Sequence, residues 1–173
     1  APTVINGGII NGAMTNAYMG KGEYLIAEAD ESDATFINIP STVAVITNID
    51  SEHLDFYKNL DNLLQAFEKY ILNLPFYGFA VVCLDNKYCA EIAQKITNRK
   101  ILTYSTEDSN ADILAFNIRC THDKSIFDVK INLPSHKGEV VISNIVLPAL
   151  GLHNISNSLA AIAIAAEMNF GIH

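Results

Sequence analysis

The sequence FAVVCLD, residues 79–85, places six apolar side chains in an unbroken run before one aspartate. Such a run is typical of a strand that is covered on both faces, as in a parallel sheet. Before it, apolar residues recur at helical spacing over 60–74, and Pro75 ends that pattern. A second helix is predicted over 88–96 and a second strand over 100–104. This alternation indicates an α/β domain with right-handed crossovers.

The chain before this stretch holds two further apolar runs. Residues 24–29 and 42–49 are each predicted to form a buried strand of the parallel-sheet kind. Between them, residues 34–39 are expected to form a short helix or an extended segment. Residues 3–5 are β-like, and the Asn-Gly-Gly sequence at 6–8 has the residue types of a tight turn.

The pattern of residue types changes after about residue 110. Three β-rich runs, at 111–120, 125–133 and 138–147, are joined by polar or glycine-containing turns and predict an antiparallel meander. An alanine- and isoleucine-rich segment over 154–173 predicts a buried helix. The expected fold class is therefore α/β, with a mostly parallel sheet flanked by helices and an antiparallel β meander over about 110–148.

Composition narrows the class of protein. The 173 residues are enough for one domain with a hydrophobic core. A net charge of −8 without a basic cluster argues against nucleic acid as a partner. No apolar run approaches the roughly 20 residues of a membrane span and no signal peptide is apparent, so we expect a cytoplasmic protein without a membrane partner. The three cysteines, at irregular spacing, are typical of reduced thiols.

Polar clusters follow two of the predicted strands. Four carboxylates lie within residues 28–33, directly after the first buried strand, and residues 47–55 form a second polar cluster after the strand at 42–49. Ligands of open α/β sheets collect beyond the carboxyl ends of strands. If the two strands are neighbours, Glu28 and His53 lie on one rim and predict a site for Mg²⁺ or Mn²⁺. The alternatives are a solvated acidic loop and a helix-capping or surface histidine.

Two other segments could bind a ligand. In GLHNISN, residues 151–157, Asn154 and Asn157 are three residues apart and could read an adenine or amide edge. The alternative is that Asn154 is a helix N-cap and Asn157 a polar residue of the first turn. The Asn-Gly-Gly sequence at 6–8 forms either a backbone nest for an anion or a simple tight turn.

Taken together, these motifs resemble the central domain of the Mur ligase family, over about residues 2–171. The resemblance rests on four stretches in order and at matching spacing: YLIAEADESDATF (24–36), VAVITNIDSEHLDFY (43–57), NLPFYGFAVVCLD (73–85) and GLHNISNSLAAIAIA (151–165). Within the family, residues 73–78 resemble the members that add L-alanine to UDP-N-acetylmuramate. A murein-tripeptide recycling ligase and a non-catalytic Mur-like binding module are the alternatives.

The resemblance implies a chemistry and a set of residues. ATP phosphorylates the substrate carboxylate, the amine of L-alanine attacks the acyl phosphate, and Mg²⁺ ions neutralise the phosphates. Glu28 is implied to be a ligand of the Mg²⁺ beside the β- and γ-phosphates, and His53 a ligand of the second Mg²⁺. The other implied contacts are Asn48 to the γ-phosphate or the substrate, His153, Asn154 and Asn157 to the adenine, and Asn6, Gly7 and Gly8 to the muramyl substrate.

The resemblance also predicts the domain organisation. Residues 1–173 are expected to be a partial central, ATP-binding domain, because the family's P-loop and its N-terminal and C-terminal domains have no counterpart in this chain. A first residue that is Ala1 and not methionine fits an excised fragment. Without a P-loop lysine, this chain alone is expected to bind nucleotide weakly and not to turn over. One departure from the family is Leu150-Gly151, which stands where Pro-Gly is usual.

Overall fold

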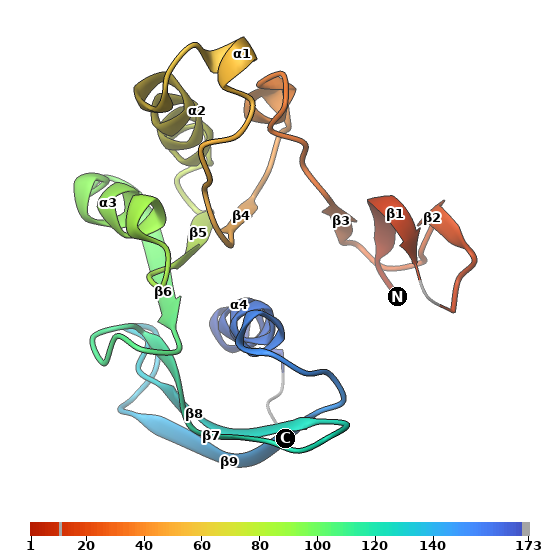
Figure 1. Cartoon of the computed structure of the whole chain (residues 1–173), viewed down its shortest axis with the longest axis vertical. Helices are drawn as coiled ribbons and strands as arrows, with labels where there is room; N and C mark the ends of the chain where they lie inside the picture. The colour runs from red at the N-terminus through yellow and green to blue at the C-terminus, as the bar shows by residue number, and fades with distance from the viewer. Residues whose placement is uncertain (11, 171–173) are drawn as a thin grey trace. The chain divides into compact units, whose positions relative to one another are not determined.

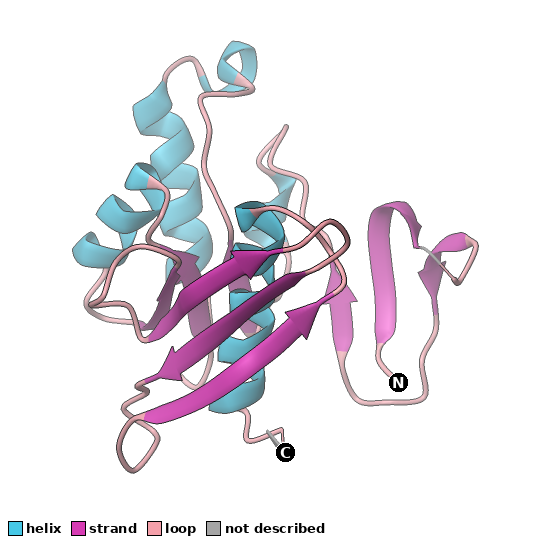
Figure 2. Cartoon of the chain, turned by 60° about the horizontal axis from the view of Figure 1, so that its bottom comes forward, coloured by secondary structure: helices cyan, strands magenta, loops and turns pink. Residues whose placement is uncertain are grey.

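The structure is a computed structural model that describes residues 1–10 and 12–170. Figure 1 colours the chain from its N-terminus to its C-terminus, and Figure 2 colours it by secondary structure. The chain divides into two compact units, Ala1–Ile39 and Pro40–His173, and each is described by itself.

The N-terminal unit is built on a small three-stranded sheet (Figure 1). Strand β1 (Thr3–Ile10) lies in the middle, antiparallel to β2 (Thr15–Tyr18) and parallel to β3 (Leu25–Ala27). A four-residue 3₁₀ helix, η1 (Thr35–Asn38), follows, and it confirms the short helix expected over residues 34–39.

Two predictions for this unit were wrong. Residues 6–8 do not form a turn: they lie inside β1, and neither glycine has a positive φ. A backbone nest needs a left-handed residue, so these residues do not form one either. The strand predicted over 24–29 is only three residues long and is not buried, since Leu25 is 60% exposed and Ile26 57%. β3 is also not a strand of the larger parallel sheet, where helices would cover both of its faces, because it belongs to the small sheet.

The larger unit is built on a six-stranded sheet in the order β4-β5-β6-β7-β8-β9. Strands β4 to β7 pair in parallel, and β7 to β9 pair antiparallel, so one continuous sheet holds both expected parts. All five residues of β5 are buried, as the FAVVCLD run predicts. The strand bounds are Val43–Ile46 (β4), Phe79–Cys83 (β5), Lys100–Ser105 (β6), Ile113–Cys120 (β7), Ser125–Ile131 (β8) and Val140–Leu147 (β9).

Helices cover both faces of the parallel strands. Figure 1 shows α2 (Leu60–Leu72) and α3 (Lys87–Lys95) on one side of β5 and β6, and α4 (Leu152–Glu167) on the other. A one-turn helix, α1 (Leu54–Tyr57), precedes α2. The helices at 60–74 and 88–96 are confirmed within a few residues. The last helix begins two residues earlier than predicted and ends at Glu167, while residues 171–173 of its predicted range lie outside the described residues.

The main core lies between α4 and the sheet. Ile155, Leu159 and Ala163 of α4 recur every four residues and are fully buried, so they form one stripe along the helix. Each large apolar side chain buried in this way contributes about 2 kcal/mol. The sheet supplies the other half of the core, from alternate residues of its central strands: Phe79, Val81, Cys83, Leu102, Tyr104, Ile113, Ala115, Phe127, Val129 and Ile131.

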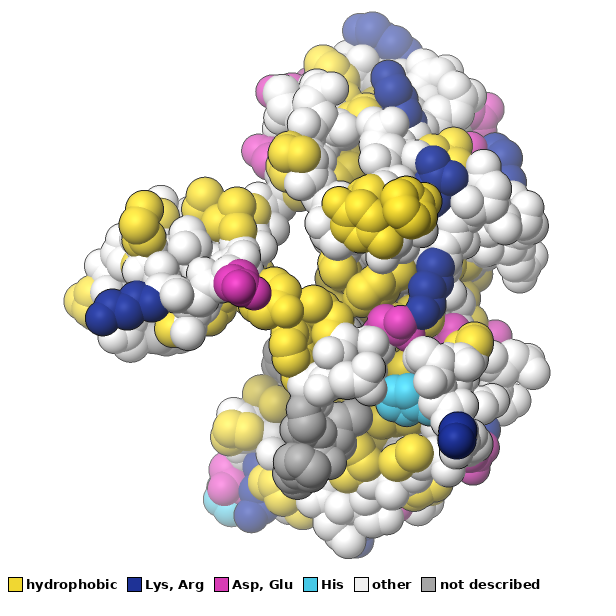
Figure 3. All heavy atoms as spheres, turned by 180° about the vertical axis from the view of Figure 1, so that it is seen from behind, with side chains coloured by type: hydrophobic (Ala, Val, Ile, Leu, Met, Phe, Trp, Pro, Cys, Tyr) yellow, Lys and Arg dark blue, Asp and Glu magenta, His cyan; other side chains and the backbone are white. Residues whose placement is uncertain are grey.

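Apolar side chains also reach the surface of the larger unit. Phe76 is 95% exposed and Tyr77 67% in the turn between α2 and β5, and their rings lie edge to face with centroids 5.3 Å apart. On the face drawn in Figure 3, lysine and arginine side chains are scattered and do not form one patch. Among the described residues, no helix is long and apolar enough to cross a bilayer.

Candidate functional site

The carboxyl ends of β4 and β5 lie at one edge of the parallel sheet, where open α/β sheets bind their ligands. One side chain ties together the two loops that leave this edge. Asn86 Nδ2 donates a hydrogen bond to the backbone oxygen of Ile49 at 3.1 Å. Asn86 Oδ1 accepts from the backbone N–H groups of Tyr88 (3.0 Å) and Cys89 (3.1 Å) and so caps α3. The loop after β4 is therefore anchored to the start of α3.

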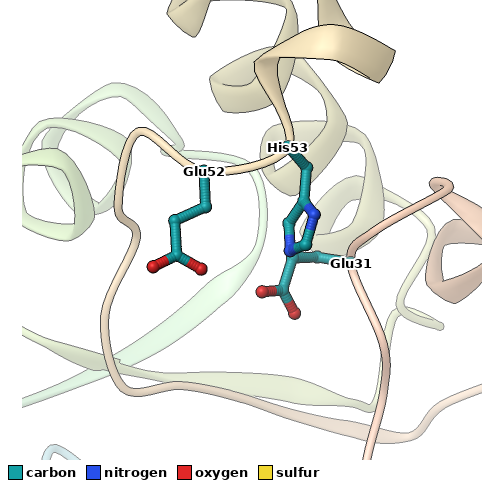
Figure 4. A group of neighbouring side chains, drawn as sticks. All are labelled: Glu31, Glu52 and His53. Carbon is teal, nitrogen blue, oxygen red and sulfur yellow. The ribbon is translucent and has the colours of Figure 1, made fainter.

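That loop carries three predicted or possible site residues. Asn48 is exposed, and its Nδ2 donates to Thr47 Oγ1 at 3.2 Å. His53 is the N-cap residue of α1, with φ 55°, but its side chain makes no capping hydrogen bond. Ligand atoms of Glu52 and His53 lie within 4.8 Å of each other, and both side chains extend to the same side of the loop (Figure 4). Glu31, also drawn in Figure 4, belongs to the N-terminal unit.

A buried serine fixes the end of the next strand. Ser105, the last residue of β6, is fully buried, and its Oγ donates to Asp85 Oδ1 in the loop after β5. The same Oγ accepts from the backbone N–H groups of Glu107 (2.9 Å) and Asp108 (2.7 Å). Asp85 also accepts from the backbone N–H and the hydroxyl of Thr106. These hydrogen bonds link the end of β6 to the loop after β5.

The start of α4 lies at the same edge. Ser156 Oγ is 3.5 Å from Sγ of Cys83, the last residue of β5, so the residues on either side of Ser156 lie near the carboxyl end of that strand. The N-cap residue is Gly151, with φ 96°, and it makes no side-chain cap. The alternative of an N-cap at Asn154 is therefore wrong. Asn154 lies in the first turn, where its Nδ2 donates to the backbone oxygen of Leu150 at 2.8 Å.

His153, Asn154 and Asn157 thus share the first two turns of one helix. His153 and Asn157 are exposed, and Asn154 is half-buried. Asn154 keeps its side-chain carbonyl as an acceptor while its amide binds Leu150, and the amide of Asn157 offers both a donor and an acceptor. This arrangement can recognise a heterocycle that presents a donor and an acceptor on one edge.

The N-terminal unit brings together two of the predicted segments. Glu28 follows β3, and its backbone N–H donates to the backbone oxygen of Ile5 at 2.9 Å. Its Oε2 accepts from the backbone N–H of Gly7 at 2.6 Å. Asn6 Nδ2 donates to the backbone oxygen of Gly8 at 3.0 Å. The acidic residue and the Asn-Gly-Gly sequence therefore lie side by side, which their separation of 21 residues in the sequence did not indicate.

The acidic residues after Glu28 shape the loop. Asp30 Oδ1 accepts from the backbone N–H of Ser32 at 2.8 Å, and Asp33 Oδ1 accepts from that of Thr35 at 3.0 Å. Hydrogen bonds from Thr35 lower the pKa of Asp33 below its ordinary value. Short carboxylates commonly order turns in this way.

Behind the sheet edge lie buried thiol and hydroxyl groups. Burial, with a further contribution from Cys83, raises the pKa of the Cys89 thiol to about 12. Burial also raises the pKa of Tyr104, whose hydroxyl finds no hydrogen-bond partner among the described residues. Cys83 and Cys89 are free thiols inside the molecule, and Cys120 is a free thiol on its surface. These groups belong to the packing and not to the rim.

The predicted site residues are divided between the two units. Asn48, His53 and the start of α4 belong to the larger unit, and Glu28 with residues 6–8 belongs to the smaller one. Sequence reasoning missed Asn86, and the signal was present, because this asparagine directly follows a buried strand and its aspartate. It also did not single out Glu52, the neighbour of His53 in the same loop.

Comparisons with known proteins agree with this geometry. The family model described as the Mur ligase middle domain matches residues 10–165. The UDP-N-acetylmuramate–L-alanine ligase of Rickettsia bellii is 59% identical over 171 residues, which are 99% of this chain and 36% of that protein. The chain therefore spans about a third of the length of this relative.

Solved structures show the same fold. The UDP-N-acetylmuramate-alanine ligase of Thermotoga maritima superposes with a TM-score of 0.76 at 24% identity, over 97% of this chain and 35% of that one. MurF ligase from Thermotoga maritima, solved in complex with ADP, superposes with a TM-score of 0.67 at 18% identity, over 97% of this chain and 40% of that one. At these identities the structural similarity shows the fold alone. Membership of the family rests on the family model, which covers most of the sequence. The chain belongs to the Mur ligase family, of which it is a middle domain.

Proposed function

We propose that this chain is the central, ATP-binding part of a ligase that adds L-alanine to UDP-N-acetylmuramate in peptidoglycan synthesis. The observation that carries the proposal is the 59% identity over 99% of the chain to a protein named for that reaction. The fold alone does not choose among Mur ligases, because two ligases named for different substrates superpose on it with the same TM-score of 0.76.

The proposed chemistry joins a carboxylate to an amine. The γ-phosphoryl group of ATP passes to the carboxylate of the muramyl substrate, which gives an acyl phosphate and releases ADP. The amine of L-alanine then attacks the acyl carbon, an amide forms, and phosphate leaves. Asn48 is proposed to contact the γ-phosphate or the substrate, and Asn6, Gly7 and Gly8 are proposed to face the muramyl substrate. Such contacts hold reacting groups in line.

Each of the two units carries donor atoms that suit a hard divalent cation. Glu28 supplies a carboxylate whose Oε1 accepts no hydrogen bond among the described residues, and the loop after β4 supplies the imidazole of His53 beside the carboxylate of Glu52. Carboxylate oxygens suit Mg²⁺ or Mn²⁺. Glu28 and His53 are therefore proposed as metal ligands. Magnesium, when bound, neutralises the charge of the phosphates.

The start of α4 is proposed to hold the adenine. Adenine presents a donor and an acceptor on one edge, and Asn154 and Asn157 carry amide groups that match both. His153 lies beside them on the exposed side of the first turn. Gly151 allows the left-handed turn that sets the direction of this helix start, and a Cβ there would lie 2.7 Å from the His153 ring.

The rest of the machinery is proposed to lie in other parts of the same ligase. A phosphate-binding P-loop, a domain for the UDP moiety and a domain that helps to select the amino acid are the parts the family would require. On this proposal the ligase works in the cytoplasm, where ATP is available, and the 173-residue chain alone does not turn over.

The test follows phosphate release by the full-length ligase that carries this chain. With ATP, Mg²⁺ and UDP-N-acetylmuramate, release should depend on L-alanine. Glu28→Gln and His53→Ala should each lower the rate about 100-fold or more, with little change in melting temperature. Asp55→Asn, an exposed change two residues after His53, is the matched control and should leave the rate within about twofold.

The assay also separates the alternatives. Release that depends on murein tripeptide and not on L-alanine would assign the recycling reaction. If no phosphate is released with either substrate, the protein would be a binding module without ligase activity. Full turnover in Glu28→Gln or His53→Ala would remove that residue from the proposed metal site.

A further inference from the structure

The carboxylate of Glu28 takes the place of a backbone hydrogen-bond acceptor in the pairing of β1 with β3. In this parallel pair, Glu28 N–H donates to Ile5 O, so the next backbone donor on β1 that faces β3 is the N–H of Gly7. That N–H donates to Glu28 Oε2 at 2.6 Å. The side chain therefore folds back onto the neighbouring strand and is held by a fixed backbone group. Charge-assisted bonds of this kind are among the stronger hydrogen bonds in proteins.

Gly7 provides the room for this contact as well as the donor. A Cβ placed on Gly7 would lie 3.1 Å from Glu28 Oε2, which is tighter than ordinary contact, so that oxygen would have to move by a few tenths of an ångström. The adjacent glycine differs. A Cβ on Gly8 would meet only Asn6 Nδ2, at an ordinary 3.8 Å. Neither glycine has a positive φ, so alanine is compatible with the backbone at both positions.

We infer that Gly7 is a positioning residue for Glu28: its N–H holds Oε2, and Oε1 is left as the oxygen that faces the cation. This inference rests on the proposed function, in which Glu28 is a metal ligand. The carboxylate makes no other hydrogen bond among the described residues, so this one contact fixes its orientation. A ligand that is already oriented loses less freedom when the ion binds, and its affinity for the ion is higher.

The first test needs neither metal nor substrate. In the metal-free 173-residue chain, nuclear magnetic resonance should place the amide proton of Gly7 downfield of ordinary glycine values. Glu28→Ala should return it to those values, because the acceptor is gone, whereas Glu23→Ala, an exposed glutamate before β3, should leave it unchanged. A Gly7 amide proton that does not respond to Glu28→Ala would overturn the inference.

The second test measures Mn²⁺ affinity of the full-length ligase by electron paramagnetic resonance. Gly7→Ala should weaken binding about fivefold, the effect of one exposed charge-assisted hydrogen bond. Turnover is not scored for this variant, because Gly7 is itself proposed to face the substrate. Gly8→Ala should keep Mn²⁺ affinity within about twofold. It is scored on affinity and not on turnover, because Gly8 is itself proposed to face the substrate.

The outcomes separate this inference from the proposed function. If Glu28→Ala abolishes Mn²⁺ binding while Gly7→Ala and Gly8→Ala have equal, small effects, the role of Gly7 is wrong and the metal site stands. If Glu28→Ala leaves Mn²⁺ affinity unchanged, the proposed metal site is wrong, and the role of Gly7 falls with it. Weaker binding in Gly7→Ala alone, with the response of its amide to Glu28→Ala, would support the inference.

Discussion

Replacing Asn86 by alanine should lower the free energy of unfolding of the larger unit more than replacing Asn59, which also caps a helix. Asn86 Oδ1 caps α3 by accepting from the N–H groups of Tyr88 and Cys89, and its Nδ2 donates to Ile49 O. Asn59 caps α2 by accepting from one backbone N–H, that of Asn62, at 2.8 Å. The two variants therefore share the loss of an N-cap, and only Asn86→Ala also frees the loop after β4.

The magnitudes follow from these contacts. Loss of an asparagine N-cap costs about 1 kcal/mol of the free energy of unfolding, and Asn59→Ala should cost that amount. Asn86→Ala should cost about 2 kcal/mol, because it also removes a neutral hydrogen bond worth about 1 kcal/mol. The buried side chain of Ile49 anchors the loop. Without Asn86, the carbonyl of Ile49 therefore cannot turn freely toward water to replace the lost hydrogen bond.

The assay is urea unfolding of the 173-residue chain followed by far-UV circular dichroism. This signal reports on the larger unit, because α2, α3 and α4 all belong to it. The denaturation midpoint of Asn86→Ala should fall about twice as far as that of Asn59→Ala, with the same slope. Equal shifts would show that the contact with Ile49 contributes nothing and would refute the reasoning.

Two further predictions concern buried polar groups. Ser105→Ala should lower the free energy of unfolding by about 2–3 kcal/mol, since one buried hydroxyl serves a carboxylate and two N–H groups. Ser158→Ala, whose hydroxyl bonds only within its own helix, should change it by less than about 0.5 kcal/mol in the same urea titration. Between about pH 8 and about pH 10, the wild type should lose about 1 kcal/mol more stability than Cys89→Ala does. The folded state holds the thiol proton to about pH 12, while the unfolded chain releases it near pH 9.0, so stability falls as pH rises through that window. Equal slopes for the two proteins would contradict this.

The elements that were predicted from sequence are those whose residue pattern matches their packing. The run at 79–83 is apolar on every residue and is buried on every residue, because helices cover both faces of β5. The run at 24–27 looks the same in sequence, yet Leu25 and Ile26 are exposed. Apolar composition indicates a strand, but which elements cover that strand depends on the rest of the fold.

Turn signals failed where pairing decided the conformation. Residues 6–8 have the composition of a turn, but β1 continues through them, and the irregularity appears as a shift of register against β2 between Ile5 and Ile10. Strand β2, with the sequence TNAY, was not predicted because it is short and has no apolar alternation. At the start of α4, Gly151 and not Asn154 takes the N-cap position.

The positions of the polar residues at strand ends could be predicted from the sequence, but their contacts could not. The carboxylates after β3 and the polar residues after β4 were expected at strand ends, because ligands bind there. The pairing of Gly7 with Glu28 and of Asn86 with Ile49 depends on strand register and helix position, which a single sequence does not specify.

The measurement that tests the central claim most directly is isotope transfer in the full-length ligase. The enzyme would be given UDP-N-acetylmuramate labelled with ¹⁸O in both oxygens of its carboxylate, together with ATP, Mg²⁺ and L-alanine. Attack of that carboxylate on the γ-phosphorus makes one of its oxygens the bridge to phosphorus, and the amine then expels phosphate with that oxygen attached. We expect a single ¹⁸O in each phosphate released. Unlabelled phosphate would mean that water and not the carboxylate takes the phosphoryl group, and would contradict the account.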